Sequence, residues 1–366
     1  MESRKFGNTQ LTPSILGFGM MRLKRREDNT IDEQWAIETL HHAIDHGITY
    51  VDTAYTYTDS ERVTGLCLQD GYREKVTLAT KLPVGKMTCP EDFDRILDEQ
   101  LQRLQTDHID VYLLHALNRT SWENVEKFNV LEQAERARAQ GKIRYLGFSF
   151  HDNLEVFKKI LNAHPWDFCQ IQLNYMDVNY QAGLEGMRLA NEKGMAVVIM
   201  EPLRGGKLAD VPPQVAAMLP ASPVESALDF LWDMPQVNVV LSGMSEREQV
   251  EQNLAYASRA HAGMLTPRHR ETMIAAGDLM RETISVPCTG CNYCNVCPQG
   301  IAIPEIFALH NRRQLYGDAQ SARKAYLDLG QRNAERCICC GTCVKYCPQH
   351  IEVCAELLKL DKLYRK

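Results

Sequence analysis

The stretch "KVTLATKLPVGKMTCPEDFDRILDEQLQRLQTDHIDVYLLH" (75–115) contains two short apolar runs with a longer, partly polar segment between them. The runs 75–82 and 108–115 are rich in Val, Leu and Ile, as expected for parallel strands that are covered on both faces. The segment 91–105 has the periodicity of a helix with one apolar face. Its apolar stripe consists of Phe93, Ile96, Leu97, Leu101 and Leu104. The stretch therefore predicts a strand–helix–strand unit.

Six further apolar runs of the same kind alternate with helical segments in the first 260 residues or so. They lie at 14–20, 48–54, 143–150, 167–174, 195–201 and 237–243. Eight strand–helix units in this length fit an α/β fold of the (β/α)8 TIM-barrel type. A doubly wound sheet is the alternative, and it normally carries a G-x-G-x-x-G turn after its first strand. The corresponding "GFGMMR" (17–22) lacks that pattern, so the sequence favours a barrel over residues 1–275.

Composition excludes several classes of function. The chain has 366 residues, a formal net charge of −6 and 24% charged residues. This length suffices for one large domain and one small one. A mildly acidic balance argues against a broad nucleic-acid surface. The start, "MESRKFGNTQ", lacks the apolar stretch of a signal peptide, and no apolar run reaches about 18 residues. We expect a cytoplasmic protein with no membrane span.

The cysteines divide the chain into two regions. Of the 13 cysteines, three are scattered (Cys67, Cys89 and Cys169), and the other ten lie between Cys288 and Cys354. In a cytosolic chain such clustering indicates metal binding before disulfides. Around the cysteines we expect mostly helical structure, at 264–284, 305–336 and 352–366. The sequence thus predicts a small second domain over residues 276–366.

Four polar residues fall at or just after predicted barrel strands, where a barrel carries its chemistry. They are Asp52, Tyr57, Lys81 and His115. Each alone has an ordinary structural explanation: a turn cap, a packed ring, a solvated amine or a core histidine. Together they suit proton transfer, because a lysine ammonium lowers the pKa of a nearby phenol and an aspartate can hold the lysine. A neutral histidine can orient a carbonyl oxygen, so the set predicts general acid catalysis.

The quoted motifs also resemble a known family. "GNTQLTPSILGFGMMRL" (7–23), "VDTAYTY" (51–57), "TKL" (80–82) and "DVYLLH" (110–115) occur in the order and spacing of the aldo-keto reductases. The resemblance implies a catalytic tetrad of Asp52, Tyr57, Lys81 and His115. Tyr57 would be the proton donor, Lys81 and Asp52 would tune it, and His115 would orient a small carbonyl substrate.

The same resemblance implies a nicotinamide nucleotide, NADP(H) or NAD(H), held across the barrel mouth. The implied cofactor-binding residues are Gly19, Met20, Asp52, Ser149, Gln170, Leu203, Gly205, Gly206, Lys207, Ser242, Gly243, Gln249 and Asn253. Phe150 and Glu201 depart from the usual Asn and aromatic residue. The basic residues that often grip a 2′-phosphate are replaced, with Arg247 as a nearby substitute. A simple helix cap is the alternative interpretation of the segment after the eighth strand.

Two cysteine runs carry the second chemistry. The first is Cys288-x2-Cys291-x2-Cys294-x2-Cys297-Pro, and the second is Cys337-x2-Cys340-x2-Cys343-x3-Cys347-Pro. The second has the ferredoxin spacing C-x2-C-x2-C-x3-C-P, and the first is one residue shorter. Zinc needs only two C-x2-C pairs, and disulfides do not suit the compartment. Iron–sulfur ligation is favoured over zinc and thiol chemistry.

Residues from about 280 onward resemble ferredoxin domains with two [4Fe-4S] clusters, of the α-helical type. In such ferredoxins the fourth cysteine of each run ligates the other cluster. We therefore define two cysteine sets. The first set is Cys288, Cys291, Cys294 and Cys347; the second set is Cys337, Cys340, Cys343 and Cys297. Cys339 and Cys354 are expected to be spare thiols.

The sequence thus predicts an NAD(P)H-dependent oxidoreductase whose clusters pass single electrons to or from a redox protein partner. Nicotinamide transfers hydride, whereas a cluster transfers one electron, and no recognisable flavin motif bridges the two. The alternative is an iron–sulfur domain that senses redox state or docks a partner without electron coupling. A catalytically degenerate barrel is a third alternative, against which the complete tetrad argues.

Overall fold

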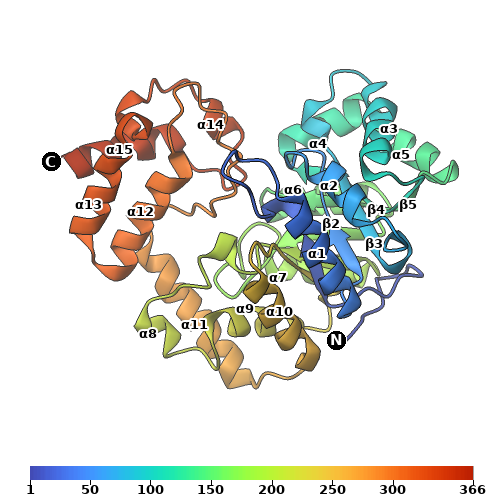
Figure 1. The fold of residues 1–366 in the computed structure, drawn as a ribbon, viewed down its shortest axis with the longest axis horizontal. Coiled ribbons are helices and arrows are strands. Elements are labelled where there is room, and N and C mark those ends of the chain that lie inside the picture. Colours follow the sequence, from blue (N-terminus) through green and yellow to red (C-terminus); the bar gives the residue numbers. More distant parts are fainter. Residues whose placement is uncertain (366) are drawn as a thin grey trace. The chain divides into compact units, whose positions relative to one another are not determined.

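The structure, a computed structural model, describes residues 1–365, and within them eight parallel strands close into a barrel in sequence order (Figure 1). The strands are β1 (Leu16–Gly19), β2 (Tyr50–Asp52), β3 (Thr77–Leu82), β4 (Ile109–Leu117), β5 (Ile143–Phe150), β6 (Phe168–Gln172), β7 (Ala196–Met200) and β8 (Val239–Ser242). All eight apolar runs contain a strand, so the predicted (β/α)8 architecture is confirmed. The alternative of a doubly wound sheet is excluded, because β1 pairs with β8 as well as with β2.

Helices follow the strands, as the periodicity predicted. They are α1 (Glu33–Asp45), α2 (Ser60–Cys67), α3 (Asp92–Leu104), α4 (Arg119–Lys127), α5 (Val130–Ala139), α6 (Leu154–Ala163), α7 (Gly183–Glu192), α9 (Pro223–Trp232) and α10 (Arg247–Arg259). Helix α3 buries the expected Phe93, Ile96 and Leu104, but it buries Gln100 in place of Leu101, which is half-buried. The buried Gln100 contributes to the candidate active site.

The N-terminal segment closes the amino end of the barrel. Phe6 is fully buried among residues that begin strands, including Tyr50, Phe168, Ala196 and Val239. Its ring centroid lies 6.0 Å from that of Tyr50 and 5.4 Å from that of Phe168. Because aromatic burial is strongly stabilising, this end is a packed core. The carboxyl ends of the strands are therefore the end at which polar chemistry belongs.

The chain forms two compact units, which we treat separately. The barrel unit is Met1–Pro202 with Ala227–Thr266, and the cysteine-rich unit is Leu203–Ser226 with Pro267–Lys366. The segment Leu203–Ser226 thus lies between β7 and β8 in the chain but belongs to the cysteine-rich unit. The domain boundary at residues 275 and 276 stays a prediction.

The cysteine-rich unit is mostly helical, as predicted. Its helices are α8 (Pro213–Ala216), α11 (Pro267–Thr283), α12 (Ile303–Tyr316), α13 (Ala319–Asp328), α14 (Thr342–Lys345) and α15 (Val353–Arg365) (Figure 1). Its core contains Ile306, Phe307, Tyr326 and Leu357, contributed by α12, α13 and α15. The Tyr316 hydroxyl donates to Asp210 Oδ1 at 2.9 Å, which joins α12 to the segment Leu203–Ser226. Among residues 1–365, no helix is both long and apolar enough to cross a membrane.

Candidate active site and cysteine sites

Asp52 and Lys81 form a buried ion pair at the carboxyl ends of neighbouring strands. Asp52 is the last residue of β2, and Lys81 is the last but one of β3. Lys81 Nζ donates to both carboxylate oxygens of Asp52 and to the Thr53 carbonyl oxygen, each at 2.7 Å. The Lys81 side chain is 0% exposed. A buried ammonium is stable only when it is paired and hydrogen-bonded, and these three bonds satisfy all three of its donors.

Burial and pairing act in opposite directions on this pair. Burial lowers the pKa of Lys81, while the charge of Asp52 and its hydrogen bonds oppose the change. Burial likewise raises the pKa of Asp52, and Lys81 opposes that rise. Each group is thus the main support of the other's charged form. The result is a lysine ammonium held in place by Asp52 in a fully buried position.

Tyr57 and His115 lie beside this charge. Lys81 Nζ is 5.1 Å from the ring centroid of Tyr57. The rings of Tyr57 and His115 meet edge to face, with centroids 6.0 Å apart and an interplanar angle of 84°. Burial holds the pKa of His115 well below its usual range, and the charge of Lys81 adds to this effect. His115 is therefore neutral at pH 7, and its Nδ1 lies 3.3 Å from Thr56 Oγ1. The structure brings all four tetrad residues together.

A bulge in β4 connects His115 to Ser149. The pairing of β4 with β5 shifts register between Leu114 and Leu117, and Ala116 has a left-handed φ of 51°. The Ala116 N–H donates to Ser149 Oγ at 2.7 Å. Because a hydroxyl both accepts and donates, Ser149 keeps a donor for another partner. The bulge is a feature that alternation of apolar residues does not encode, although bulges often occur next to active sites.

Gln170 has an unmatched acceptor in the barrel. The residue is 3% exposed, its Nε2 lies 3.7 Å from Met200 Sδ, and its Oε1 has no hydrogen-bond partner among residues 1–365. An unpaired buried oxygen is costly, so it indicates a missing donor. The carboxamide of a nicotinamide ring supplies such a donor. Gln170 and the neighbouring-strand residue Ser149 therefore fit the expected nucleotide contacts.

The expected adenosine-side residues lie at the end of β8 and along α10. Asn253 Nδ2 donates to Ser242 Oγ at 3.0 Å, so these two expected contacts lie together. Gln249 Oε1 instead accepts from the backbone of Ser245 and Glu246, and it forms a capping box at the start of α10. The helix-cap interpretation thus describes the Gln249 side chain here. The neighbouring Gly243 leaves little space, because a Cβ there would lie 3.3 Å from the Arg22 side chain.

The remaining nucleotide candidates divide between the units. Gly19 ends β1 and Met20 follows it in the barrel unit, and a Cβ on Gly19 would lie 3.3 Å from the Ser242 carbonyl oxygen. Leu203, Gly205, Gly206 and Lys207 form a tight turn in the cysteine-rich unit. Gly205 and Gly206 have φ values of 65° and 92°, which glycine adopts without strain. Within this unit, the charge of Lys207 opposes the rise in the pKa of Cys288 that burial causes.

The first cysteine set converges on one cavity. The cavity is lined by all four thiols and by three apolar residues of α12, together with others (Cys288, Cys291, Cys294, Cys347, Ile303, Pro304 and Phe307). Burial raises the pKa of Cys294 to about 12, and the three other thiols add to the rise. The structure thus groups Cys347 of the second run with three cysteines of the first run. Thr289 also lines the cavity; its buried Oγ1 has no partner among residues 1–365 and suits a hydrogen bond to a cluster sulfur. The residues fit a [4Fe-4S] cluster.

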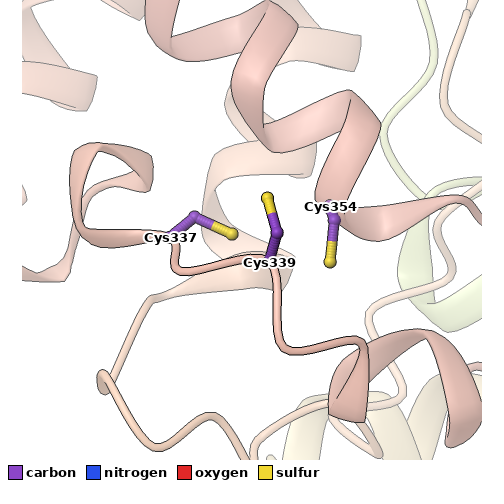
Figure 2. A group of neighbouring side chains, drawn as sticks. All are labelled: Cys337, Cys339 and Cys354. Atoms are coloured by element: carbon purple, nitrogen blue, oxygen red, sulfur yellow. The ribbon is translucent and has the colours of Figure 1, made fainter.

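The second cysteine set is arranged differently. Figure 2 shows that Cys337 lies with Cys339 and Cys354, and the three sulfurs are within 4.8 Å of one another. Burial raises the pKa of Cys343 to about 12, and the neighbouring Cys354 adds to the rise. Cys340 is exposed, and its sulfur lies 3.4 Å from Thr342 Oγ1. The structure thus groups two ligands of the second set with both thiols expected to be spare. Cys297 packs on the same helical core.

The family follows from comparison with known proteins. Residues 15–261, most of the chain, match the aldo/keto reductase family. The chain belongs to this family. Residues 287–352 match the 4Fe-4S dicluster domain, so this aldo/keto reductase carries a C-terminal 4Fe-4S domain.

Individual relatives of this aldo/keto reductase match mainly its barrel. L-galactose dehydrogenase of Arabidopsis thaliana is 28% identical over 285 residues, covering 70% of this chain and 88% of the relative. The uncharacterized oxidoreductase YqkF of Bacillus subtilis is 27% identical and is covered to 92%. The holo form of aldo-keto reductase AKR11C1 from Bacillus halodurans superposes with a TM-score of 0.63 at 27% identity, covering 75% of this chain and 96% of that one. The chain is therefore an oxidoreductase of the aldo/keto reductase type.

A buried polar network supports the tetrad of this aldo/keto reductase, and the motifs did not reveal it. Gln100 Nε2 donates to the Lys81 carbonyl oxygen at 3.1 Å and to Glu61 Oε1 at 2.7 Å. Thr80 also donates to Glu61, which is 2% exposed. Tyr112 donates to Gln100 Oε1 at 2.7 Å. One signal existed in the sequence: Gln100 is a polar residue on the apolar stripe of α3, which indicates a buried partner.

Proposed function

We propose that this aldo/keto reductase transfers hydride between NAD(P)H and a small carbonyl compound or its alcohol. The observation that carries the proposal is the buried Lys81–Asp52 pair beside Tyr57 and a neutral His115. Four groups with these separate roles are needed to protonate a carbonyl oxygen in a site that excludes water. The relative L-galactose dehydrogenase makes a small sugar, or another polyol, the substrate class to test first.

The proton step belongs to the chain's own residues. Tyr57 donates its phenolic proton to the substrate oxygen, and Lys81, 5.1 Å from the ring centroid, stabilises the phenolate that remains. Asp52 keeps Lys81 charged despite complete burial. His115, neutral because of burial, donates one N–H toward the same oxygen. NAD(P)H, when bound, supplies the hydride.

The nucleotide would lie along the expected cofactor-binding residues. Gln170 and Ser149 would hold the carboxamide, since one has an unmatched acceptor and the other a hydroxyl donor. Ser242 and Asn253 would contact the adenosine side. Glu246 caps α10 and pairs with Lys24 at 3.2 Å, and its carboxylate would repel a 2′-phosphate bound at the start of this helix. This carboxylate favours NADH over NADPH.

The cysteine-rich unit would hold two [4Fe-4S] clusters, and these clusters, when bound, supply one-electron steps. The first set would hold one cluster in its shared cavity. One hydride equivalent carries two electrons, so the two clusters would accept one electron each while a proton is released. Large apolar side chains next to the cysteines are exposed, Ile338 by 62%, together with Val296 and Tyr346. Apolar patches of this kind mark binding sites, and they suit a redox protein partner.

The second candidate function is a redox-sensing or docking module without electron coupling. Its support is the exposure of Cys339 and Cys340, because accessible thiols are the ones that oxidants reach. The step from hydride to single electrons, with no recognisable flavin motif in the chain, also favours it.

An anaerobic titration separates the two functions. Protein with reconstituted clusters is mixed with NADH or NADPH, and the cluster absorbance is followed, with dithionite as the reference for full reduction. Electron coupling predicts bleaching by the nucleotide. If only dithionite bleaches the clusters, while the nucleotide still reduces a carbonyl substrate, the second function holds. Tyr57→Phe should abolish carbonyl reduction in either case; unchanged turnover would contradict the hydride-transfer proposal itself.

A further inference from the structure

Two thiols outside the second cysteine set, Cys339 and Cys354, lie beside its member Cys337. A [4Fe-4S] cluster takes four cysteine ligands. Cys337, Cys339 and Cys354 have their sulfurs within 4.8 Å of one another (Figure 2), and Cys343 is an electrostatic neighbour of Cys354. Two of these four thiols, Cys337 and Cys343, belong to the C-x2-C-x2-C run, and the other two do not.

The position of Cys354 repeats a position at the first set. "CPQGIAIP" (297–304) and "CPQHIEVC" (347–354) are the same motif, each leading into a helix. Pro304 and Cys354 are the second residues of α12 and α15. Pro304 lines the cavity that the first set shares. Cys354 therefore occupies the position at the second set that Pro304 occupies at the first set. It has a thiol there, whereas Pro304 has a ring.

Cys340 is the least enclosed member of the second set. It is exposed, whereas Cys343 is buried and Cys337 is half-buried. Its sulfur lies 3.4 Å from Thr342 Oγ1, and Cys340 is not one of the three cysteines whose sulfurs lie within 4.8 Å of one another. An exposed thiolate ligand is the one that oxidants and solvent reach first. Of the three cysteines of this run, Cys340 is therefore the ligand that the cluster would lose most readily. Cys354 already lies beside Cys337 and Cys343.

We propose that Cys354 is a reserve ligand of the second cluster, which binds the iron that Cys340 holds when Cys340 is lost or leaves. This inference rests on the proposed presence of that cluster. In the exchange, the Cys354 thiol gives up its proton and forms a sulfur–iron bond, while the Cys340–iron bond breaks and the Cys340 thiolate takes up a proton. No electron is transferred, so the oxidation state of the cluster is unchanged.

Cys354 is better placed for this role than Cys339. Cys354 lies on the first turn of α15, whose residues Val353, Leu357 and Leu360 are buried in the unit's core. Cys339 is exposed, has a left-handed φ of 51° and is the chain neighbour of Cys340. Ligands on packed helices are held more precisely than ligands on loops. A shift that displaces Cys340 would also displace Cys339.

The test compares iron content in full-length chains reconstituted under anaerobic conditions. The variants are Cys340→Ser, Cys354→Ser, Cys340→Ser/Cys354→Ser and Cys340→Ser/Cys339→Ser. Wild-type protein should hold about eight iron atoms, from two four-iron clusters. Cys340→Ser, Cys354→Ser and Cys340→Ser/Cys339→Ser should each stay near that value. Cys340→Ser/Cys354→Ser should fall toward half of it, with loss of one cluster signal in the electron paramagnetic resonance spectrum after dithionite reduction.

The first set supplies a matched control. Cys291 occupies the place of Cys340 in the first run, and Pro304 takes the place of Cys354. Cys291→Ser should therefore lose iron by itself, since no reserve thiol is present. Cys291→Ser/Pro304→Cys should recover it. Circular dichroism and NADH-dependent carbonyl reduction verify that each variant is folded.

Three results would overturn the inference. Iron loss in Cys340→Ser equal to that in the double variant would show that no reserve exists. Equal loss in Cys354→Ser alone would make Cys354 a resident ligand. Loss with Cys339→Ser in place of Cys354→Ser would assign the role to Cys339. Wild-type protein with four iron atoms or none would instead contradict the proposed pair of clusters, and the inference with it.

Discussion

The tetrad and the second cysteine set differ in how their reactive groups are held. Lys81 of the tetrad is buried and paired, whereas Cys340 of the second set is exposed on a loop. Lys81 has all three of its donors satisfied and is 0% exposed, on strands held by their neighbours. Cys340 is exposed on a loop, and Cys337 shares its surroundings with two additional thiols. The arrangement of the site on the strands therefore needs no metal, because the charges of Lys81 and Asp52 balance each other. The loop-borne site depends on iron to bring its ligands into one arrangement.

Removal of iron should produce the largest effect. Because ligand binding by a metal contributes directly to folding free energy, anaerobic chelation should eliminate or strongly lower the thermal transition of the cysteine-rich unit. The barrel transition should remain, as its core contains no metal ligand of either set. Differential scanning calorimetry with and without chelator measures both. If the barrel melted together with the chelated unit, the two sites would not differ in their dependence on iron.

Substitution of Lys81 should have the next largest effect. Lys81→Met leaves the Asp52 carboxylate buried without a partner, which should cost about 3–5 kcal/mol of unfolding free energy. Carbonyl reduction should fall by about 10²–10⁴-fold, because Tyr57 loses the charge that stabilises its phenolate. Urea unfolding and kcat/KM measure the two effects. The control, Asp52→Asn/Lys81→Met, should recover stability without recovering rate; a recovered rate would argue against the role of Lys81.

Substitution in the polar network around Gln100 should lower the stability and the rate less than substitution of Lys81 does. Gln100→Leu removes a donor from Glu61 and from the Lys81 carbonyl oxygen, as well as the acceptor for Tyr112. Unsatisfied buried groups should lower the unfolding free energy by about 1–3 kcal/mol. The rate should change by less than about ten-fold, since Lys81 keeps its ion pair. The exposed Gln102→Leu on the same helix is the matched control and should leave both quantities nearly unchanged.

The pH dependence of stability should show the smallest effect. Burial depresses the pKa of His115 in the folded state, while the unfolded chain has the ordinary value of about 6.5. The unfolded state therefore binds more protons below that pH. The stability contributed by neutral His115 is full above about pH 6.5 and declines as pH falls toward the folded pKa, by at most about 1.4 kcal/mol per pH unit. Urea unfolding from pH 7.5 to 5 should show a shallower decline in His115→Asn than in wild type; parallel curves would exclude this contribution.

The sequence predicted what short-range pattern encodes. Each barrel strand is buried on both faces, so its apolar run appears without reference to any other strand. The four tetrad candidates could be selected because each falls at or just after a strand within a motif of fixed spacing. The partners of Gln100 could not be predicted in this way, because Glu61 and Tyr112 meet it only after α2, α3 and β4 have packed.

The spacing of the cysteines likewise predicts only which thiols lie close together along the chain. The gaps within "CICCGTC" (337–343) predict which thiols one loop can offer, and they leave Cys339 as an additional thiol. They carry no information about Cys354, eleven residues further on, which reaches the loop only because α15 begins there. The turn between Cys347 and that helix brings it back, and turn geometry is weakly specified by residue type.

The segment Leu203–Ser226 makes the two halves of this chain inseparable by truncation. It leaves the barrel unit after β7, is completed by residues beyond Pro267 and leads into the helix that precedes β8. A nascent chain that has just finished β8 therefore still lacks the partners of this segment, such as Tyr316 for Asp210. An engineer who transplants the tail to another barrel must therefore move this segment with it.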